Sequence, residues 1–384
     1  MRPFDAAAVK RELKRRAAEL GAADLRVVAA FADAESRERM HASFARGDLA
    51  TWGYDAAYAQ TAADPSAVLP GARSIVCIAV PYATAPPERA PLSGRVSNYA
   101  WSDDYHRRVR TLLRDLAAML DEIAGEPVTA VACDTKPIAE RAFAARAGLG
   151  WVGKHTNLIS PELGSFIFLG EIVTTLDLAA DAPLQKSCGS CSRCIDACPT
   201  GALRGDYTID ANRCISDLTQ RTGSIPRDMR ALIGDWVWGC DVCQVACPPT
   251  ARAGLQGDAA AVPRDGAAAP DLLALLRLRS GEFKRRFAPT AMGWRGAAVL
   301  RRNAAVALGN ALDRSAVPGL LETLRDDPHP MVRGHAAWAL GRLASKAALD
   351  GLREASIPET DAGVREEIAA ALEPHDACAA LERV

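Results

Sequence analysis

Hydrophobic and polar positions along the first 180 residues switch between helical and strand-like spacing. Residues 10–20 and 105–123 carry apolar side chains three and four positions apart, which predicts two amphipathic helices. Apolar runs predict three buried strands, at 74–80, 127–133 and 165–176. A further helix is expected between Pro137 and Gly148. This order of elements predicts an α/β domain over residues 1–180.

The last hundred residues contain an internal repeat. The segment 301–309 matches 333–341 at a spacing of 32 residues, and a weaker copy at 365–372 follows after a further 32. Between the first two copies, residues 317–324 supply the apolar pattern of a second helix. Paired helices at this period are typical of HEAT-like repeats, which we expect over residues 285–384. Solenoids of this kind usually bind a partner.

Two further regions lie between these domains. Residues 181–250 are rich in cysteine and are expected to form a domain of their own. Residues 251–284 are expected to be a connector, because 251–270 is dominated by Ala, Gly and Pro and shows no periodic pattern.

Composition narrows the class of protein. The chain has 384 residues, of which 49% are hydrophobic and 24% charged, enough for several domains with apolar cores. Neither an export signal nor a run of about 18 apolar residues is recognisable, so we expect a cytoplasmic protein with no membrane partner. We also expect a monomer. In a reducing compartment, eleven cysteines indicate metal or redox chemistry rather than disulfides. Three isolated cysteines are interpreted as packing residues: Cys77, Cys133 and Cys378.

The other eight cysteines lie between Cys188 and Cys247. The first four, followed by Pro199, form the run C-x2-C-x2-C-x3-C-P of bacterial ferredoxins. Zinc is the alternative, but four-thiolate zinc sites rarely use three cysteines in tandem x2 spacing. The run therefore favours [4Fe–4S] clusters in a ferredoxin-like domain over residues 181–250.

The second run, C-x2-C-x3-C-P, is one cysteine short of the usual four, and Cys214 can complete it. In ferredoxin runs the fourth cysteine ligates the other cluster. This rule assigns the first cluster to Cys188, Cys191, Cys194 and Cys247. It assigns the second cluster to Cys198, Cys214, Cys240 and Cys243. Two clusters suit the relay of single low-potential electrons from an external donor, so the remaining domains are expected to carry a substrate, a second cofactor or both.

Several segments around these cysteines and upstream of them are distinctive. They are Asp134–Pro137 with Glu140–Ala142, Ala147–Lys154, Gly164–Ser165 with Leu169–Ile172, Cys198–Ala202, Asp210–Ser216 and Gly239–Gln244. In this combination the chain resembles the epoxyqueuosine reductase family over nearly its whole length. The family reduces the epoxide of epoxyqueuosine at the wobble position of tRNA to queuosine. The resemblance implies an oxidoreductase with a base-off cobalamin in the N-terminal domain. It also implies a tRNA partner that carries epoxyqueuosine in its anticodon loop.

The chemistry that the resemblance implies is reductive. The clusters would reduce cobalt to cob(I)alamin, a nucleophile that attacks an epoxide carbon, and Asp134 would protonate the opening oxygen. From the residues alone, Asp134 followed by Pro137 and Glu140 also fits a helix N-cap. The signature D-x-H-x-x-G of histidine ligation to cobalt is absent, because Val109 stands where it requires glycine.

The family-like segments also supply candidate cobalamin contacts. The candidates are Tyr99, Asp134, Lys154, Asn157, Ser165, Ser216 and Asp241. Apart from Asp134, each of them also fits a turn, a cap or a core position. Asn98 stands where the family pattern is expected to have a basic residue, so no corrin or tRNA contact is assigned to it.

A basic stretch offers a way for a chain with a net charge of −1 to bind tRNA. Residues 271–310 hold eight basic side chains against two acidic ones, and Arg301 and Arg333 recur at one repeat position. The residues assigned to tRNA contact are Arg285, Arg286, Arg301, Arg302 and Arg333. The alternative is a solvated helical face. Trp294 fits either the core or a stacking surface, whereas Trp338 lies among alanines and is expected in the core. The modified base would have to leave the anticodon stack to reach the cobalt.

Two other functions fit part of these patterns. A reductive dehalogenase-like cobalamin enzyme shares the corrin and the two clusters, but it has no need of a helical solenoid. A non-catalytic iron–sulfur electron-transfer protein would dock through its repeats and contain clusters without a corrin.

Overall fold

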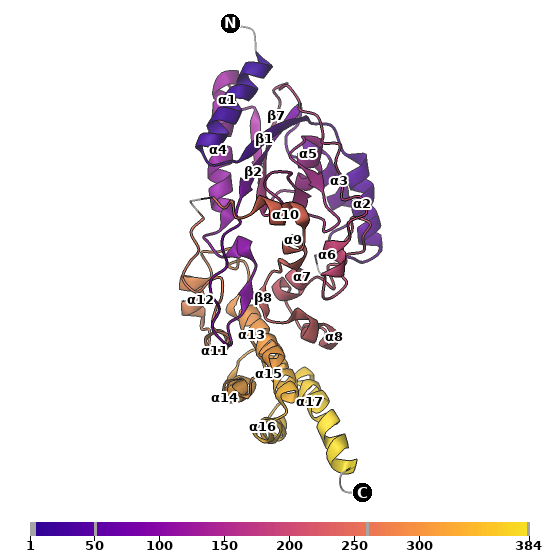
Figure 1. The fold of residues 1–384 in the computed structure, drawn as a ribbon, viewed down its shortest axis with the longest axis vertical. Coiled ribbons are helices and arrows are strands. Elements are labelled where there is room, and N and C mark those ends of the chain that lie inside the picture. Colours follow the sequence, from indigo (N-terminus) through magenta and orange to yellow (C-terminus); the bar gives the residue numbers. More distant parts are fainter. Residues whose placement is uncertain (1–4, 50–51, 259–260, 382–384) are drawn as a thin grey trace. The chain divides into compact units, whose positions relative to one another are not determined.

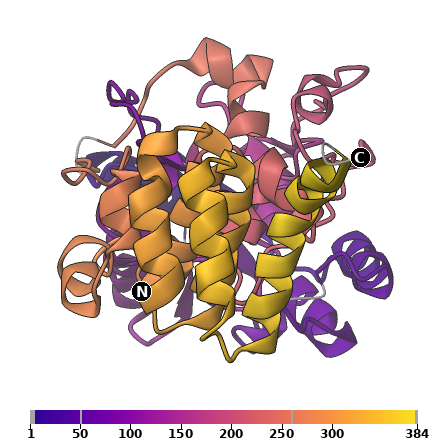
Figure 2. The same cartoon turned by 90° about the horizontal axis from the view of Figure 1, so that it is seen from below.

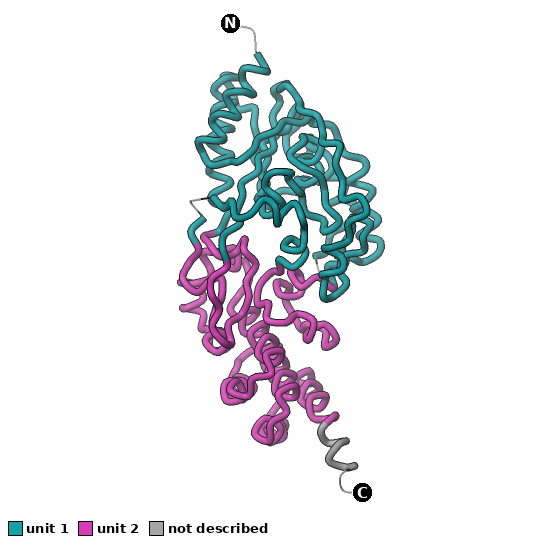
Figure 3. The backbone as a smooth tube through the Cα atoms, viewed as in Figure 1, with its two compact units in different colours: residues 1–85, 104–212, 241–262 teal, residues 86–103, 213–240, 263–384 magenta. Residues whose placement is uncertain are grey.

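The computed structural model describes residues 5–49, 52–258 and 261–381, which form two compact units. Unit 1 comprises residues 1–85, 104–212 and 241–262, and unit 2 comprises residues 86–103, 213–240 and 263–384 (Figure 3). Each unit therefore collects three stretches of chain that are far apart in the sequence.

Unit 1 is built on a four-stranded sheet (Figure 1). Its strands, in spatial order, are β1 (Asp24–Ala29), β2 (Ser74–Pro81), β7 (Ile167–Thr174) and β4 (Thr129–Ala132). All three strand pairs are antiparallel. The three predicted strands are confirmed, and β2 is buried along its whole length. The unbroken apolar run of β2 fits this central position, because both faces of the strand are covered.

Helices cover both faces of the sheet. On one face, α1 (Ala6–Glu19) and α4 (Tyr105–Ala124) pack leucines such as Leu13, Leu112 and Leu116 against β1, β2 and β7. On the other face, α5 (Glu140–Arg146) packs Phe143 and Ala144 onto the same strands. The helices predicted at 10–20, at 105–123 and before Gly148 are confirmed. Burying each of these large apolar side chains contributes about 1.5–3 kcal/mol.

Shorter elements complete unit 1. They are α2 (Ala34–Ala45), α3 (Ala56–Ala63), η1 (Pro65–Ala67), β5 (Trp151–Val152), β6 (Leu158–Ile159), α6 (Arg193–Asp196), α9 (Val242–Val245) and α10 (Pro248–Ala253). The last three are single turns or little more, and each contains or directly follows a cysteine of the two runs.

Unit 2 consists mainly of helices around a two-stranded parallel pairing of β3 (Arg95–Val96) with β8 (Trp236–Trp238). Its short elements are η2 (Asn98–Ala100), α7 (Ile215–Gln220), α8 (Arg227–Arg230), η3 (Ala231–Ile233), α11 (Leu272–Leu276) and α12 (Ser280–Arg286). The repeat helices are α13 (Ala297–Ala311), η4 (Arg314–Ala316), α14 (Val317–Asp326), α15 (Pro330–Leu343), α16 (Lys346–Ser356) and α17 (Ala362–Leu381). The helix pairs expected from the repeat are therefore confirmed.

Equivalent helices of successive repeats lie side by side, as the orange to yellow α13, α15 and α17 show in Figure 2. The repeated glycines explain this close approach. A Cβ added to Gly309 would lie 2.8 Å from a ring carbon of Trp338, and one added to Gly341 would lie 2.7 Å from Cβ of Ala371. Glycine at this repeat position therefore lets neighbouring helices pack backbone against side chain.

The segment expected to be a connector is not free of secondary structure. It contains the end of α10, all of α11 and most of α12. In the part of the chain that the structure describes, no helix is both long and apolar enough to cross a membrane. Of the three isolated cysteines, Cys77 and Cys133 are buried as expected. Cys378 lies outside the residues whose side chains are described.

Candidate active site and cluster sites

Asp134 lies in the turn between β4 and α5, and its side chain is 64% exposed. Its carboxylate accepts a hydrogen bond of 2.9 Å from the Tyr105 hydroxyl and lies 3.5 Å from Nε2 of His106. Its φ angle is +51°, in the left-handed region that residues other than glycine rarely adopt. Two residues of α4 thus orient the carboxylate of a strained loop residue, an arrangement that is common at functional sites.

The interpretation of Asp134 as a helix N-cap is wrong. Ala139 occupies the N-cap position of α5, and no side chain caps that helix. The chain needs five residues of turn after Asp134 before α5 begins, so the carboxylate is too far from the first turn and is engaged by α4 instead.

His106 lies between two carboxylates. Its Nδ1 is 2.6 Å from Asp104, while its Nε2 faces Asp134. Burial opposes the charge of His106, but hydrogen bonds to Asp104 and Asp134 outweigh burial and raise the pKa of His106 to about 9. Burial alone would raise the pKa of Asp134, but the hydrogen bonds from His106 and Tyr105 leave it below its usual range. At neutral pH the site therefore holds an imidazolium ion beside an aspartate.

A stack of rings fixes the position of Tyr105. The Tyr105 ring lies parallel to Phe168 at 4.1 Å between centroids, and its other neighbour is His106 at 4.0 Å. Phe168, on β7, stacks in turn on Tyr82 at 4.3 Å. The hydroxyl that binds Asp134 is thus anchored to the central strand of the sheet.

The four thiols assigned to the first cluster line one cavity of unit 1, of about 560 Å³. They are Cys188, Cys191, Cys194 and Cys247. No Asp or Glu is among the described residues that line it, whereas Lys186 and Arg252 are. This donor set fits a [4Fe–4S] cluster, which four thiolates make negatively charged.

Lys154 belongs to the loop around this cavity. Its ammonium donates hydrogen bonds to the carbonyl oxygens of Gly189 and Cys191, at 2.9 and 3.0 Å. Lys154 was a candidate cobalamin contact, and the structure shows that it ties together the first cysteine run. Because both acceptors are backbone carbonyls within C-x2-C, Lys154 fixes the conformation of that turn.

Ser165 is also engaged behind the first cysteine run. It is buried, and both its amide and its hydroxyl lie within hydrogen-bonding distance of Oγ1 of Thr250. A Cβ on the preceding Gly164, whose φ is +70°, would lie 2.5 Å from Cα of Thr250. Gly164 and Ser165 therefore hold α10, which follows Cys247.

The four cysteines assigned to the second cluster come from both units. Cys198 and Cys243 belong to unit 1, and Cys214 and Cys240 belong to unit 2. Burial opposes ionisation of Cys198, but hydrogen bonds from Thr200 and from nearby backbone amides outweigh burial and lower its pKa, which favours a thiolate ligand. The described residues contain no group of three or more His, Cys, Asp or Glu arranged to hold a metal ion, so the assignment of ligands to both clusters stays a prediction.

The other candidate cobalamin contacts form local hydrogen bonds. In unit 2, Tyr99 and Ser216 are brought together by Gln220, which accepts from the Tyr99 hydroxyl at 3.2 Å and donates to Oγ of Ser216 at 3.0 Å. In unit 1, Asp241 is buried, and its carboxylate accepts from the side chain of Gln244 at 3.4 Å. The backbone amide of Asn157 donates to Nδ1 of His155.

The predicted tRNA contacts on α13 are wrong, because Arg301 and Arg302 are buried. Arg301 pairs with Asp327 at 2.6 Å and donates to the carbonyl of Leu278. The guanidinium of Arg302 donates to the carbonyl oxygens of Leu218, Arg221 and Gly223 and to Oδ1 of Asn303. Both side chains hold unit 2 together, and Arg302 has no exposed surface that a phosphate could contact.

Arg333 repeats the arrangement of Arg301 one unit along the solenoid. It pairs with Glu359 at 2.8 Å and donates to the carbonyl of Asp327, and its side chain is only 14% exposed. Most of this side chain is therefore covered, and the tRNA contact of Arg333 stays a prediction. The recurring arginine neutralises the acidic residue in the loop that follows its own helix pair.

Arg285 and Arg286, on α12, differ from each other in exposure. Lys284 and Arg285 are exposed, whereas Arg286 is half-buried, pairs with Glu282 and lies over the ring of Phe287. The described basic side chains of α12 that remain open to a polyanion are thus Lys284 and Arg285.

The two tryptophans also differ. Trp294 is 48% exposed and is covered on one face by the guanidinium of Arg295 at 3.7 Å. Trp338, expected in the core, is half-buried between Arg230 and Arg342. The alanine-rich surroundings of Trp338 misled the prediction, because long arginine side chains rather than apolar residues cover its ring.

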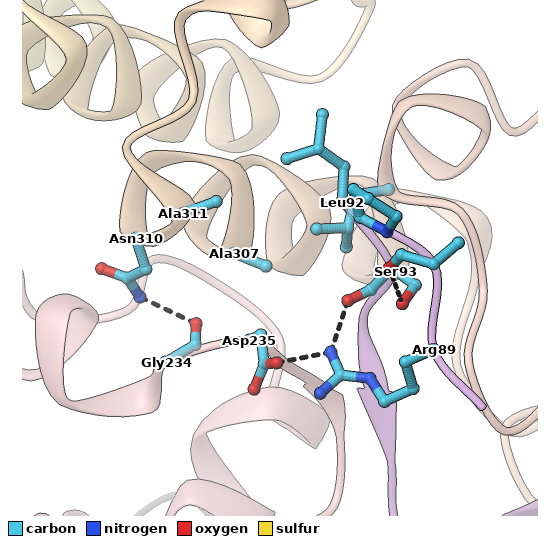
Figure 4. A pocket seen from close by; sticks show the side chains of 11 residues that line it. Arg89, Leu92, Ser93, Gly234, Asp235, Ala307, Asn310 and Ala311 are labelled. Carbon is cyan, nitrogen blue, oxygen red and sulfur yellow. Dashed lines mark hydrogen bonds and ion pairs between the residues drawn. The ribbon is translucent and has the colours of Figure 1, made fainter. Parts of the chain in front are cut away.

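Unit 2 also contains a cavity of about 630 Å³ that no motif in the sequence indicates. Arg89 crosses its wall and donates to Ser93 O at 2.6 Å and to Asp235 at 2.5 Å (Figure 4). On the opposite wall, Asn310 donates to the carbonyl of Gly234 at 2.8 Å. The polar groups of each wall are thus bound locally, and the mixed lining of the cavity indicates no distinct ligand chemistry.

Four residues of the Asp134 site were missed by sequence reasoning. They are Tyr105, His106, Glu140 as a side-chain partner, and Glu171. Glu140 accepts a 2.5 Å hydrogen bond from the backbone amide of Asp134, and Glu171 is fully buried on β7. The only signal for Glu171 was a carboxyl in an otherwise apolar strand run.

Comparison with known proteins places this arrangement in a family. Family models match three parts of the chain: "Epoxyqueuosine reductase QueG, DUF1730" at residues 63–135, "4Fe-4S double cluster binding domain" at 187–250 and "HEAT repeats" at 295–373. An epoxyqueuosine reductase of Lactococcus garvieae is 38% identical over 325 residues, which cover 83% of this chain and 92% of that relative.

Two solved structures are similar along the whole chain. One is an epoxyqueuosine reductase with an epoxyqueuosine-modified tRNA-Tyr stem loop, at 34% identity and a TM-score of 0.89. The other, from Bacillus subtilis, has its catalytic aspartate loop swung out of the active site, at 33% identity and a TM-score of 0.88. Each comparison covers 95% of this chain and 98% of the other. This chain, with its double [4Fe–4S] domain and HEAT-like repeats, therefore belongs to the epoxyqueuosine reductase family of oxidoreductases.

Proposed function

We propose that this protein reduces the epoxide of epoxyqueuosine at the wobble position of tRNA to queuosine, with Asp134 as the proton donor. The observation that carries the proposal is the array in which His106, charged at neutral pH, lies 3.5 Å from an exposed carboxylate. Family membership supports the reaction, and the relative with a modified tRNA stem loop supports the substrate.

The array suits the proton chemistry of the reaction. Removal of the epoxide oxygen as water consumes two electrons and two protons and leaves a carbon–carbon double bond. At neutral pH the Asp134–His106 pair holds one proton, which rests on His106 because the pKa of His106 is raised to about 9 and that of Asp134 is lowered. As the opening oxygen gains negative charge it becomes a stronger base than the carboxylate, and it draws this proton from His106 through Asp134, which Tyr105 holds in place.

The cofactors of the proposal are base-off cobalamin and two [4Fe–4S] clusters fed by an external donor. The ring nitrogens of His106 are engaged by Asp104 and Asp134, so the donor set fits a cobalamin whose cobalt takes no ligand from this histidine. Cobalamin, when bound, would supply the low-potential nucleophile, and the eight assigned cysteines would hold the clusters that feed it. The cavity lined by four of these thiols supports the first cluster.

The proposed tRNA contact of unit 2 moves to α12. Lys284 and Arg285 are exposed there, whereas Arg301, Arg302 and Arg333 are committed to internal partners. We assign to the exposed pair a contact with the phosphate backbone, which contributes affinity without reading sequence. The wobble base would have to leave the anticodon stack to come near Asp134.

Substitution of Asp134 tests the proposal. We expect Asp134→Ala to lose turnover by at least about a hundredfold, as removal of a general acid does, while keeping cluster absorbance, corrin content and tRNA affinity. The assay is anaerobic reduction of epoxyqueuosine-containing tRNA with added cobalamin, followed by nucleoside analysis. Asp177→Asn is the matched control, because the Asp177 side chain is 63% exposed and pairs with Arg73 away from the site.

Normal turnover in Asp134→Ala would remove this residue from the mechanism. Absence of turnover in the wild-type protein loaded with both kinds of cofactor would contradict the proposed substrate. Iron–sulfur absorbance without any capacity to bind corrin would instead indicate an electron carrier.

A further inference from the structure

Two carboxyl groups lie next to each other behind Asp134, of which Glu171 is buried and Glu140 is half-buried. Glu171, in the middle of β7, is 0% exposed, and neither of its carboxylate oxygens has a hydrogen-bond donor among the described residues. Glu140, the first residue of α5, lies within hydrogen-bonding reach of it. An ionised carboxylate without a partner in such a place would cost several kcal/mol, so the pair requires a proton.

The surroundings of Glu171 are apolar. On the sheet, Glu171 is opposite Cys77 of β2 and Ala132 of β4. These neighbours belong to the cluster in which Phe143 and Ala144 of α5 cover the sheet. No cation in this layer pairs with Glu171 among the described residues.

The titratable and charged groups around the pair are known from every neighbouring element. Acidic, phenolic or thiol groups are Asp134, Cys133 after β4, Cys77 on β2 and Tyr58 on α3, and cationic groups are Arg141 and Arg146 on α5 and Arg110 on α4. Arg141 donates to the carbonyl of Thr156, and Arg146 donates to the carbonyl of Phe31. Because both arginines of α5 are engaged by backbone carbonyls, the neighbouring acidic groups dominate the electrostatics of the pair and disfavour a second negative charge on it.

Glu140 connects this buried group to the catalytic loop. One of its carboxylate oxygens, Oε1, accepts the 2.5 Å hydrogen bond from the amide of Asp134. A residue other than glycine at φ +51° costs of order 1 kcal/mol, so an external contact is needed to hold it there. The Glu140 contact is made to the backbone of the strained residue itself.

We infer that Glu171 keeps its proton and donates it in a hydrogen bond to Glu140, and that Glu140 thereby holds the amide of Asp134, making the two carboxyls a positioning device for the catalytic loop. This inference rests on the proposed role of Asp134. Loss of the shared proton puts two negative charges side by side, which drives Glu140 away from Glu171 and releases the Asp134 amide. Glu140 and Glu171 are positioning residues and do not touch the substrate.

The electrostatics agree with this geometry. Burial, followed by the charge of Glu140, raises the pKa of Glu171 well above its usual range. Burial also raises the pKa of Glu140, to about 7, although its hydrogen bond from the Asp134 amide opposes the change. The pair therefore keeps at least one proton at neutral pH and becomes fully ionised only on the alkaline side.

Hydrogen exchange at the Asp134 amide tests the inference without any assay of activity. In the wild-type protein, protection of this amide, corrected for the intrinsic exchange rate, is expected to fall by about tenfold or more between about pH 6 and pH 9. Glu171→Gln supplies an N–H donor that cannot be lost, so its protection is expected to stay constant over the same range. Glu38→Gln, exposed on α2, is the control and should behave as the wild type.

Infrared spectroscopy gives an independent measurement on the wild type. A carbonyl band of a protonated carboxyl group is expected at about neutral pH, and it should be weaker in Glu171→Gln, which loses the contribution of Glu171 and keeps only that of Glu140. The pH profile of tRNA reduction supplies a third readout, because Glu171→Gln should keep turnover at alkaline pH where the wild type loses it.

Two outcomes would overturn the inference: no protonated-carboxyl band in the wild type near neutral pH, or equal loss of Asp134 protection in the wild type and Glu171→Gln. Failure of the proposed function is a different result. If Asp134→Ala retained full turnover while amide exchange followed the expected pattern, the carboxyl pair would still position the loop, but the loop would not be catalytic.

Discussion

The carboxyl pair Glu140–Glu171 of unit 1 and the arginines Arg301 and Arg302 of unit 2 are ionisable groups in the interior of the fold. The two regions offset the free-energy cost of burying a charge in different ways. Glu171 has no donor from the rest of the described chain, and we infer that it stays neutral by keeping a proton. Arg302 is equally buried, but its guanidinium is surrounded by carbonyl oxygens and the amide oxygen of Asn303.

The difference follows from the ordinary pKa values of the two groups. A carboxyl group titrates near 4.5, so burial can shift its pKa to neutral pH and leave it uncharged, as the pKa of about 7 for Glu140 shows. A guanidinium group starts near 12.5, and even the burial that lowers the pKa of Arg302 to about 9 leaves it charged at neutral pH. The arginine therefore needs fixed acceptors and is insensitive to pH, while the carboxyl pair can respond to it.

Removal of the buried guanidinium is expected to have the largest effect. Arg302→Met would leave three backbone carbonyls without their donors, at about 1–3 kcal/mol for each buried group, so the free energy of unfolding should fall by about 3 kcal/mol or more. Urea denaturation followed by circular dichroism measures this loss. Arg285→Met, at an exposed position of α12, should change the stability by no more than about 0.5 kcal/mol. Equal stabilities of the two variants would mean that the acceptors around Arg302 are satisfied in another way.

The carboxyl pair, unlike Arg302, should make the free energy of unfolding depend on pH. Because Glu140 has a higher pKa in the folded than in the unfolded chain, the folded protein binds more protons, and stability falls as pH rises from about 4.5 to about 7. A shift from 4.5 to about 7 corresponds to a loss of about 3 kcal/mol across this window. Urea denaturation at several pH values should show this slope in the wild type and a reduced slope in Glu140→Gln.

The pH range in which stability is lost distinguishes Glu140 from acids whose pKa is lowered. Asp104 and Asp134 have pKa values below their usual range, so their stabilising contributions are lost only when the pH falls below about 4. Arg302→Met should be less stable than the wild type by the same amount at every pH of this window. A slope in Glu140→Gln as steep as that of the wild type would assign the titration to another group.

Features that depend on local spacing could be predicted from the sequence. Periodicity located the long helix α4, the buried strand β2 and the repeat helices, because local spacing reflects which face is buried. Cysteine spacing indicated the double-cluster domain, because the cysteines of each run are close in sequence. Asp134 was found through the family resemblance, and its spacing alone also fitted an N-cap.

The partners of buried charges could not be predicted in this way. The acceptors of Arg302 lie about 80 residues away in the sequence. Glu171 of β7 and its neighbour Glu140 of α5 are likewise far apart in the sequence, with β5 and β6 between them. A basic run such as 284–302 looks uniform, yet Lys284 and Arg285 are exposed on α12 whereas Arg301 and Arg302 are buried on α13. Sequence reasoning counts such charges, whereas the fold decides which of them reach solvent.

Substitution of Lys284 and Arg285, the exposed residues of that run, is expected to have the smallest effect on stability, in contrast to Arg302→Met. In Lys284→Gln/Arg285→Gln, stability should stay within about 0.5 kcal/mol of the wild type, because neither side chain is buried. The affinity for tRNA should fall about three- to tenfold, and the slope of log K against log salt should decrease by about 0.7–0.9 for each phosphate that the variant no longer neutralises. Filter binding at several salt concentrations measures both quantities.

Arg314→Gln/Lys346→Gln is the matched control for this pair, because it removes two exposed charges elsewhere in unit 2. If both double variants bound tRNA more weakly to the same degree, the effect would come from the net charge of the unit, and α12 would not be a binding site. If only Lys284→Gln/Arg285→Gln bound more weakly and with a smaller salt dependence, α12 would touch the phosphate backbone. The basic residues of one run would then divide between two tasks by burial: Arg301 and Arg302 of α13 hold the fold, and Lys284 and Arg285 of α12 contact the substrate.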